Sequence, residues 1–163
     1  MGRVVSRQEL ASLCAEAREN GRTVVFTNGC FDILHHGHVD YMARAAELGD
    51  ILVVGLNTDD SVRRLKGPSR PVVAEDDRAA VLAALAAVDY VCLFDEDTPF
   101  ELIAAIVPHV LVKGAGYTRD TIVGADVVEA AGGRVVAMSP LEGHSTRGII
   151  ARILEAGKGD PAG

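Results

Sequence analysis

Short apolar runs alternate with longer amphipathic segments along almost the whole chain. The short runs are rich in valine, isoleucine and leucine and indicate buried strands, whereas apolar residues that recur every three or four positions indicate helices. The runs predict strands at 23–27, 51–57, 90–94, 110–113 and 134–138. The helical spacing predicts helices at 37–48, 59–65, 75–87, 99–106, 124–131 and 146–154.

Polar residues mark two further features of the predicted helices. Ser6 and Glu9 have the spacing of a capping box before a helix at the N-terminus. Thr98, Pro99 and Glu101 combine an N-cap hydroxyl, a proline suited to the first helical position and a glutamate that closes a second capping box. We therefore expect Thr98 to cap the helix that follows it.

Strands that alternate with helices predict an α/β fold. Such a chain forms a parallel sheet covered by helices on both faces, which here means a Rossmann-like three-layer sandwich with a five-stranded parallel sheet. The length of 163 residues fits one domain of this kind. We expect a single domain over 1–155, with an N-terminal helix within 1–21, and a flexible C-terminal tail at 156–163.

Composition and charge narrow the possible partners. The net charge of −7 argues against nucleic acid, whose binding relies on a broad basic surface. The sequence has no apolar run of membrane-spanning length. Cys14, Cys30 and Cys92 form no C-x-x-C pair and fit a reducing compartment. We expect a cytoplasmic protein with no nucleic-acid and no membrane partner.

The segment 28–38 joins the first predicted strand to the next helix and carries the main candidate chemistry. In α/β proteins this edge of the sheet is where ligands bind. His35 and His38 bracket a glycine, and their spacing lets both imidazoles face the same way at a helix start. Gly29 allows close approach of the backbone to a ligand. Because the usual glycine-rich phosphate signatures are absent, we interpret this segment as the phosphate-binding device.

Two other interpretations of these residues have to be weighed. A lone histidine usually caps a helix or is solvated, and this is our interpretation of His36. Cys30 and Asp32, together with the two site histidines, are also potential metal ligands. A dedicated zinc site is disfavoured because no second ligand cluster exists in the sequence. A Mg²⁺ ion bound largely through ligand phosphates remains compatible, with Asp32 as a carboxylate near it.

Basic residues outside this segment provide further candidates. Lys66 and Arg70 lie in a predicted loop after the second strand and helix, where solvated surface charge is the default. Lys113 differs because it interrupts an apolar strand at its carboxyl end, directly before Gly114.

The start of the last predicted helix carries Ser145, Thr146 and Arg147. A hydroxyl at this position is often only an N-cap. The amides of a helix start also suit a phosphate, and Arg147 is near enough to assist. Both interpretations stay open on the sequence.

The motif G-x-F-D-x-x-H-x-G-H at 29–38, together with Ser145 and Thr146, resembles the cytidylyltransferase-like nucleotidyltransferases. Ile33 and Leu34 before the first motif histidine favour the branch with glycerol-3-phosphate cytidylyltransferase and the heptose-phosphate adenylyltransferases. Within that branch, segments 27–35, 57–59, 65–67, 70–71 and 112–114 are most similar to D-glycero-β-D-manno-heptose 1-phosphate adenylyltransferases. No sugar-kinase segment is present, so we expect the stand-alone form.

This resemblance implies a HIGH-type nucleotidyltransferase fold and transfer of AMP from ATP to a heptose 1-phosphate, giving ADP-heptose and pyrophosphate. It implies Mg²⁺ as cofactor, with Asp32 near the metal, and a homodimer or higher homo-oligomer. The implied catalytic residues are His35, His38 and Lys66. The implied nucleotide-binding residues are Asn28, Gly29, Cys30, Phe31, Asp32, His35, His38, Lys113, Gly114, Ser145, Thr146 and Arg147. The implied sugar-phosphate residues are Asn57, Asp59, Lys66, Arg70 and Arg78.

Alternative functions remain open on the sequence alone. The nearest is a cytidylyltransferase that uses CTP and glycerol-3-phosphate or a related polyol or amino-alcohol phosphate. A non-catalytic nucleotide-binding module on the same fold is a second. A nicotinamide-dependent dehydrogenase is disfavoured because the glycine fingerprint is missing.

Overall fold

The computed structural model describes residues 1–114, 121–139 and 141–158. Its described strands form one sheet in the order β1-β4-β3-β2-β5-β6, with all neighbouring strands parallel. The strands are β1 (Arg3–Val4), β2 (Val24–Gly29), β3 (Ile51–Asn57), β4 (Tyr90–Phe94), β5 (Val110–Gly114) and β6 (Arg134–Met138). The helices are α1 (Arg7–Glu19), α2 (His36–Ala46), α3 (Asp59–Lys66), α4 (Glu75–Ala84), α5 (Phe100–Ile106), α6 (Ala125–Ala130) and α7 (Thr146–Lys158).

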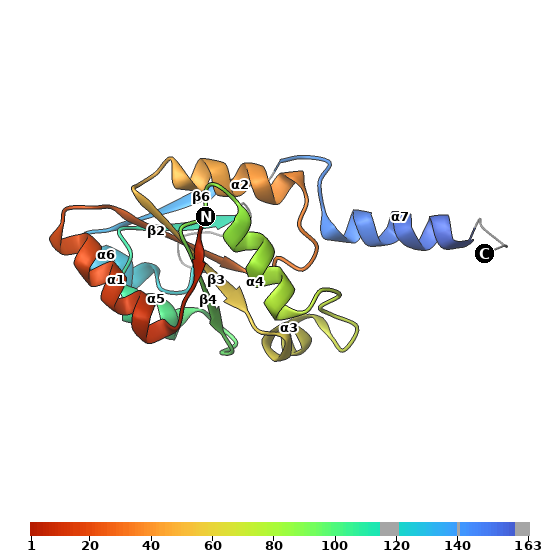
Figure 1. The fold of residues 1–163 in the computed structure, drawn as a ribbon, viewed down its shortest axis with the longest axis horizontal. Coiled ribbons are helices and arrows are strands. Elements are labelled where there is room, and N and C mark those ends of the chain that lie inside the picture. Colours follow the sequence, from red (N-terminus) through yellow and green to blue (C-terminus); the bar gives the residue numbers. More distant parts are fainter. Residues whose placement is uncertain (115–120, 140, 159–163) are drawn as a thin grey trace.

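Helices cover both faces of the sheet (Figure 1). One apolar cluster joins α1, α5 and α6 to the sheet, and a second joins α2 and α4 to its other face. Alternate residues of each strand enter opposite clusters: Val24 and Phe26 of β2 face α1, α5 and α6, whereas Val25 faces α2 and α4. Because both faces are buried, the central strands read as continuous apolar runs. The predicted three-layer α/β sandwich is confirmed.

The prediction of five strands is wrong, because the N-terminus adds a sixth. β1 consists of only Arg3 and Val4, which pair with Tyr90 and Val91 of β4. Both side chains of β1 are exposed, so the strand is held by its backbone and leaves no periodic apolar signal in the sequence.

The two predicted caps have different outcomes. Ser6 is the N-cap of α1, and its hydroxyl oxygen accepts a hydrogen bond from the amide of Glu9 at 3.2 Å. The carboxylate of Glu9 pairs with Arg3 rather than closing the capping box. Thr98 does not cap α5: the N-cap is Pro99, and no side chain caps that helix.

The last helix is longer than predicted and leaves the body of the protein. α7 continues through residues 156–158 of the predicted tail, and residues 159–163 lie outside the described part of the chain. Figure 1 shows α7 projecting away from the sandwich. Ile153 and Leu154 on it are 61% and 62% exposed. The assignment of a single domain to 1–155 stays a prediction.

The order of the strands creates a crevice beside β2. From β2 the chain continues to β3 and β4 on one side, and it then returns to β5 and β6 on the other side. In open α/β sheets, ligands bind where the connections diverge, at the carboxyl ends of the strands. Here that point lies between β2 and β5. Among the described residues, no helix combines the length and apolar character needed to cross a membrane.

Candidate active site

The loop after β2 is shaped by the packing of Phe31 on Gly29. A Cβ atom at residue 29 would lie 3.0 Å from two atoms of the Phe31 ring, so any other residue would require the ring to shift by a few tenths of an ångström. Phe31 itself has a left-handed backbone with φ of 42°, which is uncommon for a bulky residue and concentrates at functional sites. Its ring meets the ring of His38 edge-on, with centroids 5.4 Å apart. The loop therefore positions His38 through an aromatic contact.

His35 and His38 lie together at the start of α2. His35 is the N-cap residue, and the two rings stack with centroids 3.9 Å apart and an interplanar angle of 21°. The Nδ1 atoms of both rings are buried and have no hydrogen-bond partner among the described residues. The Nε2 atoms are therefore the ones left to reach a ligand in the adjacent cleft. The structure brings the two predicted catalytic imidazoles together.

Burial makes both imidazoles weak bases. Burial, followed by the neighbouring His35, lowers the pKa of His38 from 6.5 to about 4. Burial, followed by His144, lowers the pKa of His35 below its ordinary value. At neutral pH the stacked pair is thus uncharged, and each ring has one N–H to donate to a ligand.

Asp32 anchors a second loop to the site. Its Oδ1 atom accepts hydrogen bonds from the amides of Val72 and Val73 at 2.7 and 2.8 Å, and its Oδ2 atom accepts one from Arg70. Burial raises the pKa of Asp32, but the hydrogen bonds from Val73, Arg70 and Val72 outweigh it and hold the pKa below its ordinary value. The side chain is 1% exposed. Asp32 therefore does not fit the predicted place beside Mg²⁺, because both its oxygens already serve the loop.

Arg78 is a buried hub below the site. Its guanidinium donates to the backbone carbonyls of Val73, Cys30 and Asn57 at 2.9, 2.6 and 2.9 Å, and pairs with Asp59 at 2.7 Å. The side chain is fully buried. It links the loops after β2 and β3 to the segment before α4. This places Arg78 beneath the candidate site rather than on its surface.

Lys113 lies near the carboxyl end of β5, at the crevice between β5 and β2. The register that pairs Phe26 with Leu111 brings Lys113 beside Asn28, and its ammonium donates a hydrogen bond to the Asn28 side-chain oxygen. Burial lowers the pKa of Lys113 to about 8. Lys113 thus provides a partly desolvated cation on the side of the site next to the sheet.

The start of α7 forms the opposite side of the site. The Ser145 hydroxyl oxygen accepts a hydrogen bond from the amide of Gly148 at 3.0 Å, which is N-cap geometry. The Thr146 hydroxyl donates to the carbonyl of Ile33 at 3.4 Å and ties α7 to the loop after β2. The capping interpretation of Ser145 is therefore correct for its hydroxyl, and the residue also faces the cleft.

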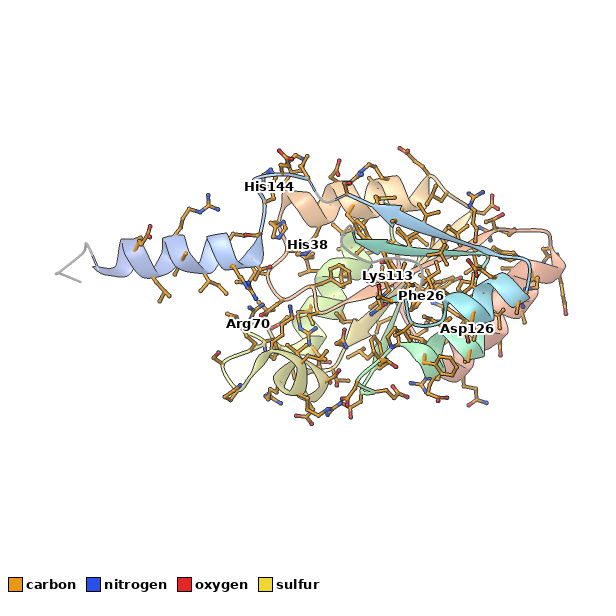
Figure 2. The ribbon with its side chains drawn as sticks, turned by 180° about the vertical axis from the view of Figure 1, so that it is seen from behind. Phe26, His38, Arg70, Lys113, Asp126 and His144 are labelled. Atoms are coloured by element: carbon orange, nitrogen blue, oxygen red, sulfur yellow. The ribbon has the colours of Figure 1, made fainter. Side chains whose placement is uncertain are left out.

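One cleft of about 1290 Å³ brings most predicted site residues together. Its volume exceeds the roughly 300–1,000 Å³ of common small-molecule sites, so it can hold two ligands. Figure 2 shows His38, Arg70 and His144 around the place where α7 leaves the body, with Lys113 nearer the sheet. The predicted residues on its wall are Asn28, Gly29, Cys30, Phe31, Asp32, His35, His38, Asn57, Lys66, Arg70, Lys113, Gly114, Ser145, Thr146 and Arg147.

Other residues of the cleft wall were not predicted from the sequence. Tyr41 lies three residues after His38 on α2, so helical spacing offered a signal for it. Its hydroxyl is 2.9 Å from the Thr27 hydroxyl. His144 directly precedes the predicted Ser145. Four apolar residues of the cleft wall come from α7 and the segment before it: Leu141, Ile150, Ala151 and Leu154. Their contribution to the wall depends on the direction in which α7 leaves the body.

A second, shallower hollow of about 710 Å³ lies beside the end of β4. Its charged residues already pair with one another. Arg7 binds Glu96 at 2.6 Å, and Arg64 binds Asp97 at 2.8 Å. The cleft beside β2 therefore remains the candidate active site. Among the described residues, no group of three or more histidine, cysteine, aspartate or glutamate side chains is placed to hold a metal ion.

Comparisons with known proteins give matches to one family and to individual proteins. A family model described as cytidylyltransferase-like matches residues 26–152. The chain is 56% identical over 149 residues to the Bifunctional protein HldE of Syntrophotalea carbinolica, covering 91% of this chain and 30% of that protein. It is 54% identical over 153 residues to the protein of the same name from Trichlorobacter lovleyi, covering 94% and 31%.

A solved structure also matches the fold of this chain. The crystal structure of a lipopolysaccharide core biosynthesis protein from Thermoplasma volcanium matches with a TM-score of 0.59 and 28% sequence identity, covering 74% of this chain and 98% of that one. The chain thus spans under a third of the length of the curated relatives reported above, but nearly all of this structural neighbour.

Proposed function

Because this chain belongs to the cytidylyltransferase-like nucleotidyltransferases, we propose that it transfers AMP from ATP to a heptose 1-phosphate, with release of pyrophosphate. The observation that carries the proposal is the single cleft that gathers two stacked imidazoles, Lys66, Arg70 and Lys113 at the divergence of β2 and β5. The sequence similarity to heptose 1-phosphate adenylyltransferases supports the acceptor. The match also covers about 30% of the length of a protein named bifunctional, as expected for the part of such a protein that carries one of its two activities.

The reaction requires little acid–base chemistry. An oxygen of the sugar phosphate attacks the α-phosphorus of ATP in line, a new P–O bond forms, and the bond to the β,γ-pyrophosphate breaks. The attacking oxygen is already anionic, so no side chain has to remove a proton. Catalysis then consists of bringing two anions together and stabilising the charge that develops on the transferred and leaving phosphates.

The residues of the cleft divide between these tasks. His35 and His38 donate hydrogen bonds to the phosphates as charge develops. Ser145, Thr146 and Arg147, at the start of α7, hold the β- and γ-phosphates. Lys113 and the backbone of 28–32 hold the nucleotide beside β2.

The acceptor side uses the loop after α3. Lys66, the last residue of α3, and Arg70, in that loop, line the cleft. They offset the repulsion between the two phosphates. Asn57 lies on the wall at the end of β3 and contacts the acceptor. Asp59 and Arg78 are absent from the wall, so we assign them to holding the loops in place.

Mg²⁺ is proposed to enter bound to the nucleotide phosphates, where it would offset their charge. No residue is assigned to it as a direct ligand, because the oxygens of Asp32 are occupied by Arg70, Val72 and Val73. We also propose a cytoplasmic location, which the free cysteines Cys14, Cys30 and Cys92 support. The homodimer or higher homo-oligomer implied by the family resemblance stays a prediction.

Pyrophosphate release tests the function. The chain is incubated with Mg²⁺, each of ATP, CTP, GTP and UTP, and either anomer of heptose 1-phosphate or glycerol-3-phosphate. We expect turnover with ATP and one heptose anomer. Preference for CTP with glycerol-3-phosphate would replace the proposed substrates, and nucleotide binding without pyrophosphate release under any acceptor would indicate a binding module.

His38→Ala supplies the mechanistic control. Removing one transition-state donor costs on the order of 10²–10³ in turnover. His36→Ala is the matched variant, because His36 is exposed on the same helix and is absent from the cleft wall. Near-normal turnover of His38→Ala at saturating ATP would contradict the proposed role.

A further inference from the structure

His144 is a third imidazole at the cleft, and it comes from a different part of the chain than His35 and His38. It directly precedes Ser145, is exposed, and lies on the cleft wall. Its ring is inclined by 21° to that of His35, with centroids 6.4 Å apart. His35 is inclined by the same angle to His38. The rings of His38 and His144 are thus each inclined by 21° to the ring of His35. Figure 2 shows His144 and His38 near the place where α7 leaves the body.

The close approach of the two segments depends on Gly37. A Cβ atom at residue 37 would lie 3.0 Å from the Cβ of His144 and 3.1 Å from the Nδ1 of His35. A Cβ atom there would require His144 or His35 to shift by a few tenths of an ångström. The absence of a side chain at Gly37 therefore allows His144 to lie this close to the stacked pair. The contact of Thr146 with Ile33 ties the same segment down at a second point.

We propose that His144 is a pyrophosphate-binding residue, which holds the β- and γ-phosphates of the nucleotide and the pyrophosphate that leaves. This inference rests on the proposed function. Ser145 and Thr146, which follow His144 directly, are the residues assigned to those phosphates. His144 approaches them from the α2 side, together with the exposed nitrogen of His35. Arg70 lies away from it on the other side of His38 (Figure 2), where the acceptor is expected.

A purely structural role makes a different prediction. His144 also meets the ring of His36 edge-on, with centroids 5.1 Å apart. If His144 acted only through this contact with His36, removal of His36 would disturb the site as much as removal of His144. His36 is exposed and does not line the cleft. His36→Ala therefore removes the ring contact with His144 without removing a residue of the cleft wall.

Calorimetric titration with inorganic pyrophosphate, with and without Mg²⁺, tests the proposal on the wild-type chain, His144→Ala and His36→Ala. We expect the dissociation constant of His144→Ala to rise about tenfold or more, the size of a lost hydrogen bond to a charged group. His36→Ala should bind as the wild type does. His144→Gln, which keeps a donor, should recover part of the affinity. Thermal unfolding of each variant checks that the fold is retained.

Kinetics in the reverse direction give a second measurement. With ADP-heptose and pyrophosphate as substrates, His144→Ala should raise KM for pyrophosphate while leaving KM for the nucleotide-sugar within about twofold, because a single lost contact acts on one ligand.

Three results would overturn the assignment of His144: wild-type affinity of His144→Ala, an equal loss in His36→Ala, or no binding of pyrophosphate by the wild-type chain. Absence of turnover with every nucleotide and acceptor would instead reject the proposed function. The binding comparison would still decide the role of His144 in that case.

Discussion

Lys113, at the end of β5, donates a hydrogen bond to the side-chain oxygen of Asn28, at the end of β2. These two strands are neighbours in the sheet, yet their connections leave in opposite directions. The hydrogen bond therefore spans the crevice where an α/β sheet binds its ligand. Burial lowers the pKa of this lysine to about 8, so its charge depends on pH within an accessible range.

The affinity for ATP should fall as the pH rises through about 8. Below this pH Lys113 is protonated and attracts the nucleotide, and above it the charge is lost. Titration calorimetry of ATP at a series of pH values measures the effect in the wild type and in Lys113→Met. The methionine variant should bind about tenfold more weakly at neutral pH and show no such step. A wild-type affinity that stays constant through this range would contradict the prediction.

Protonation of His38 should destabilise the folded chain in acid. Its pKa is about 4 in the fold and near 6.5 in the unfolded chain. The unfolded state therefore binds the proton more readily, and the free energy of unfolding falls as the pH drops from about 6.5 to about 4. Urea unfolding at several pH values should show a shallower fall for His38→Gln than for the wild type. His36→Gln is the matched control, and an identical slope in His38→Gln would argue against the effect.

Replacement of Arg78 should lower stability more than replacement of a surface arginine. Arg78→Met leaves the Asp59 carboxylate and three carbonyls without their donor, and breaking a buried ion pair in this way costs about 3–5 kcal/mol. Arg63→Met removes an exposed pair with Asp60 and should change the free energy of unfolding by less than about 0.5 kcal/mol. Urea unfolding of both variants measures the two free energies of unfolding. Equal losses of stability would contradict the structural role assigned to Arg78.

Asp32→Asn should weaken acceptor binding without altering the response to metal. The substitution removes the charge that holds Arg70 in the cleft, so KM for the sugar phosphate should rise about tenfold. The Mg²⁺ concentration that gives half-maximal activity should stay the same, because Asp32 is not assigned as a ligand. Asp40→Asn, which loses the partly buried pair with Arg44, is the matched control. A large rise in the Mg²⁺ requirement would restore Asp32 as a metal residue.

The layers of the fold were predictable because burial on both faces leaves a strong signal. The run 51–57 is apolar throughout, and it is β3 to the residue. β1 left no such signal, because its two residues pair only through the backbone and expose their side chains. Thr98 had the right residue type for a cap, but the helix begins after Pro99, where no side chain caps it. Local patterns thus predict elements that bury side chains and miss those fixed by backbone contacts.

The candidate site was predictable where its chemistry is contiguous in sequence. His35 and His38 meet because they lie three positions apart at a helix start. The roles of Asp32 and Arg78 were not predictable, because Val72 lies 40 residues after Asp32 and Cys30 lies 48 residues before Arg78, and only the tertiary fold brings these partners into contact. The same holds for His144, whose place beside His35 depends on a glycine 107 positions earlier in the sequence.

Because α7 projects from the body, the shape of the cleft can vary separately from the stability of the fold. The sandwich carries the sheet, the core and the stacked imidazoles, whereas α7 adds the apolar wall of the cleft through Ile150, Ala151 and Leu154. Because residues 151–157 are exposed rather than packed in the core, their replacement carries little cost in folding. The shape of the cleft is thereby open to mutation and selection independently of the scaffold that carries the stacked imidazoles.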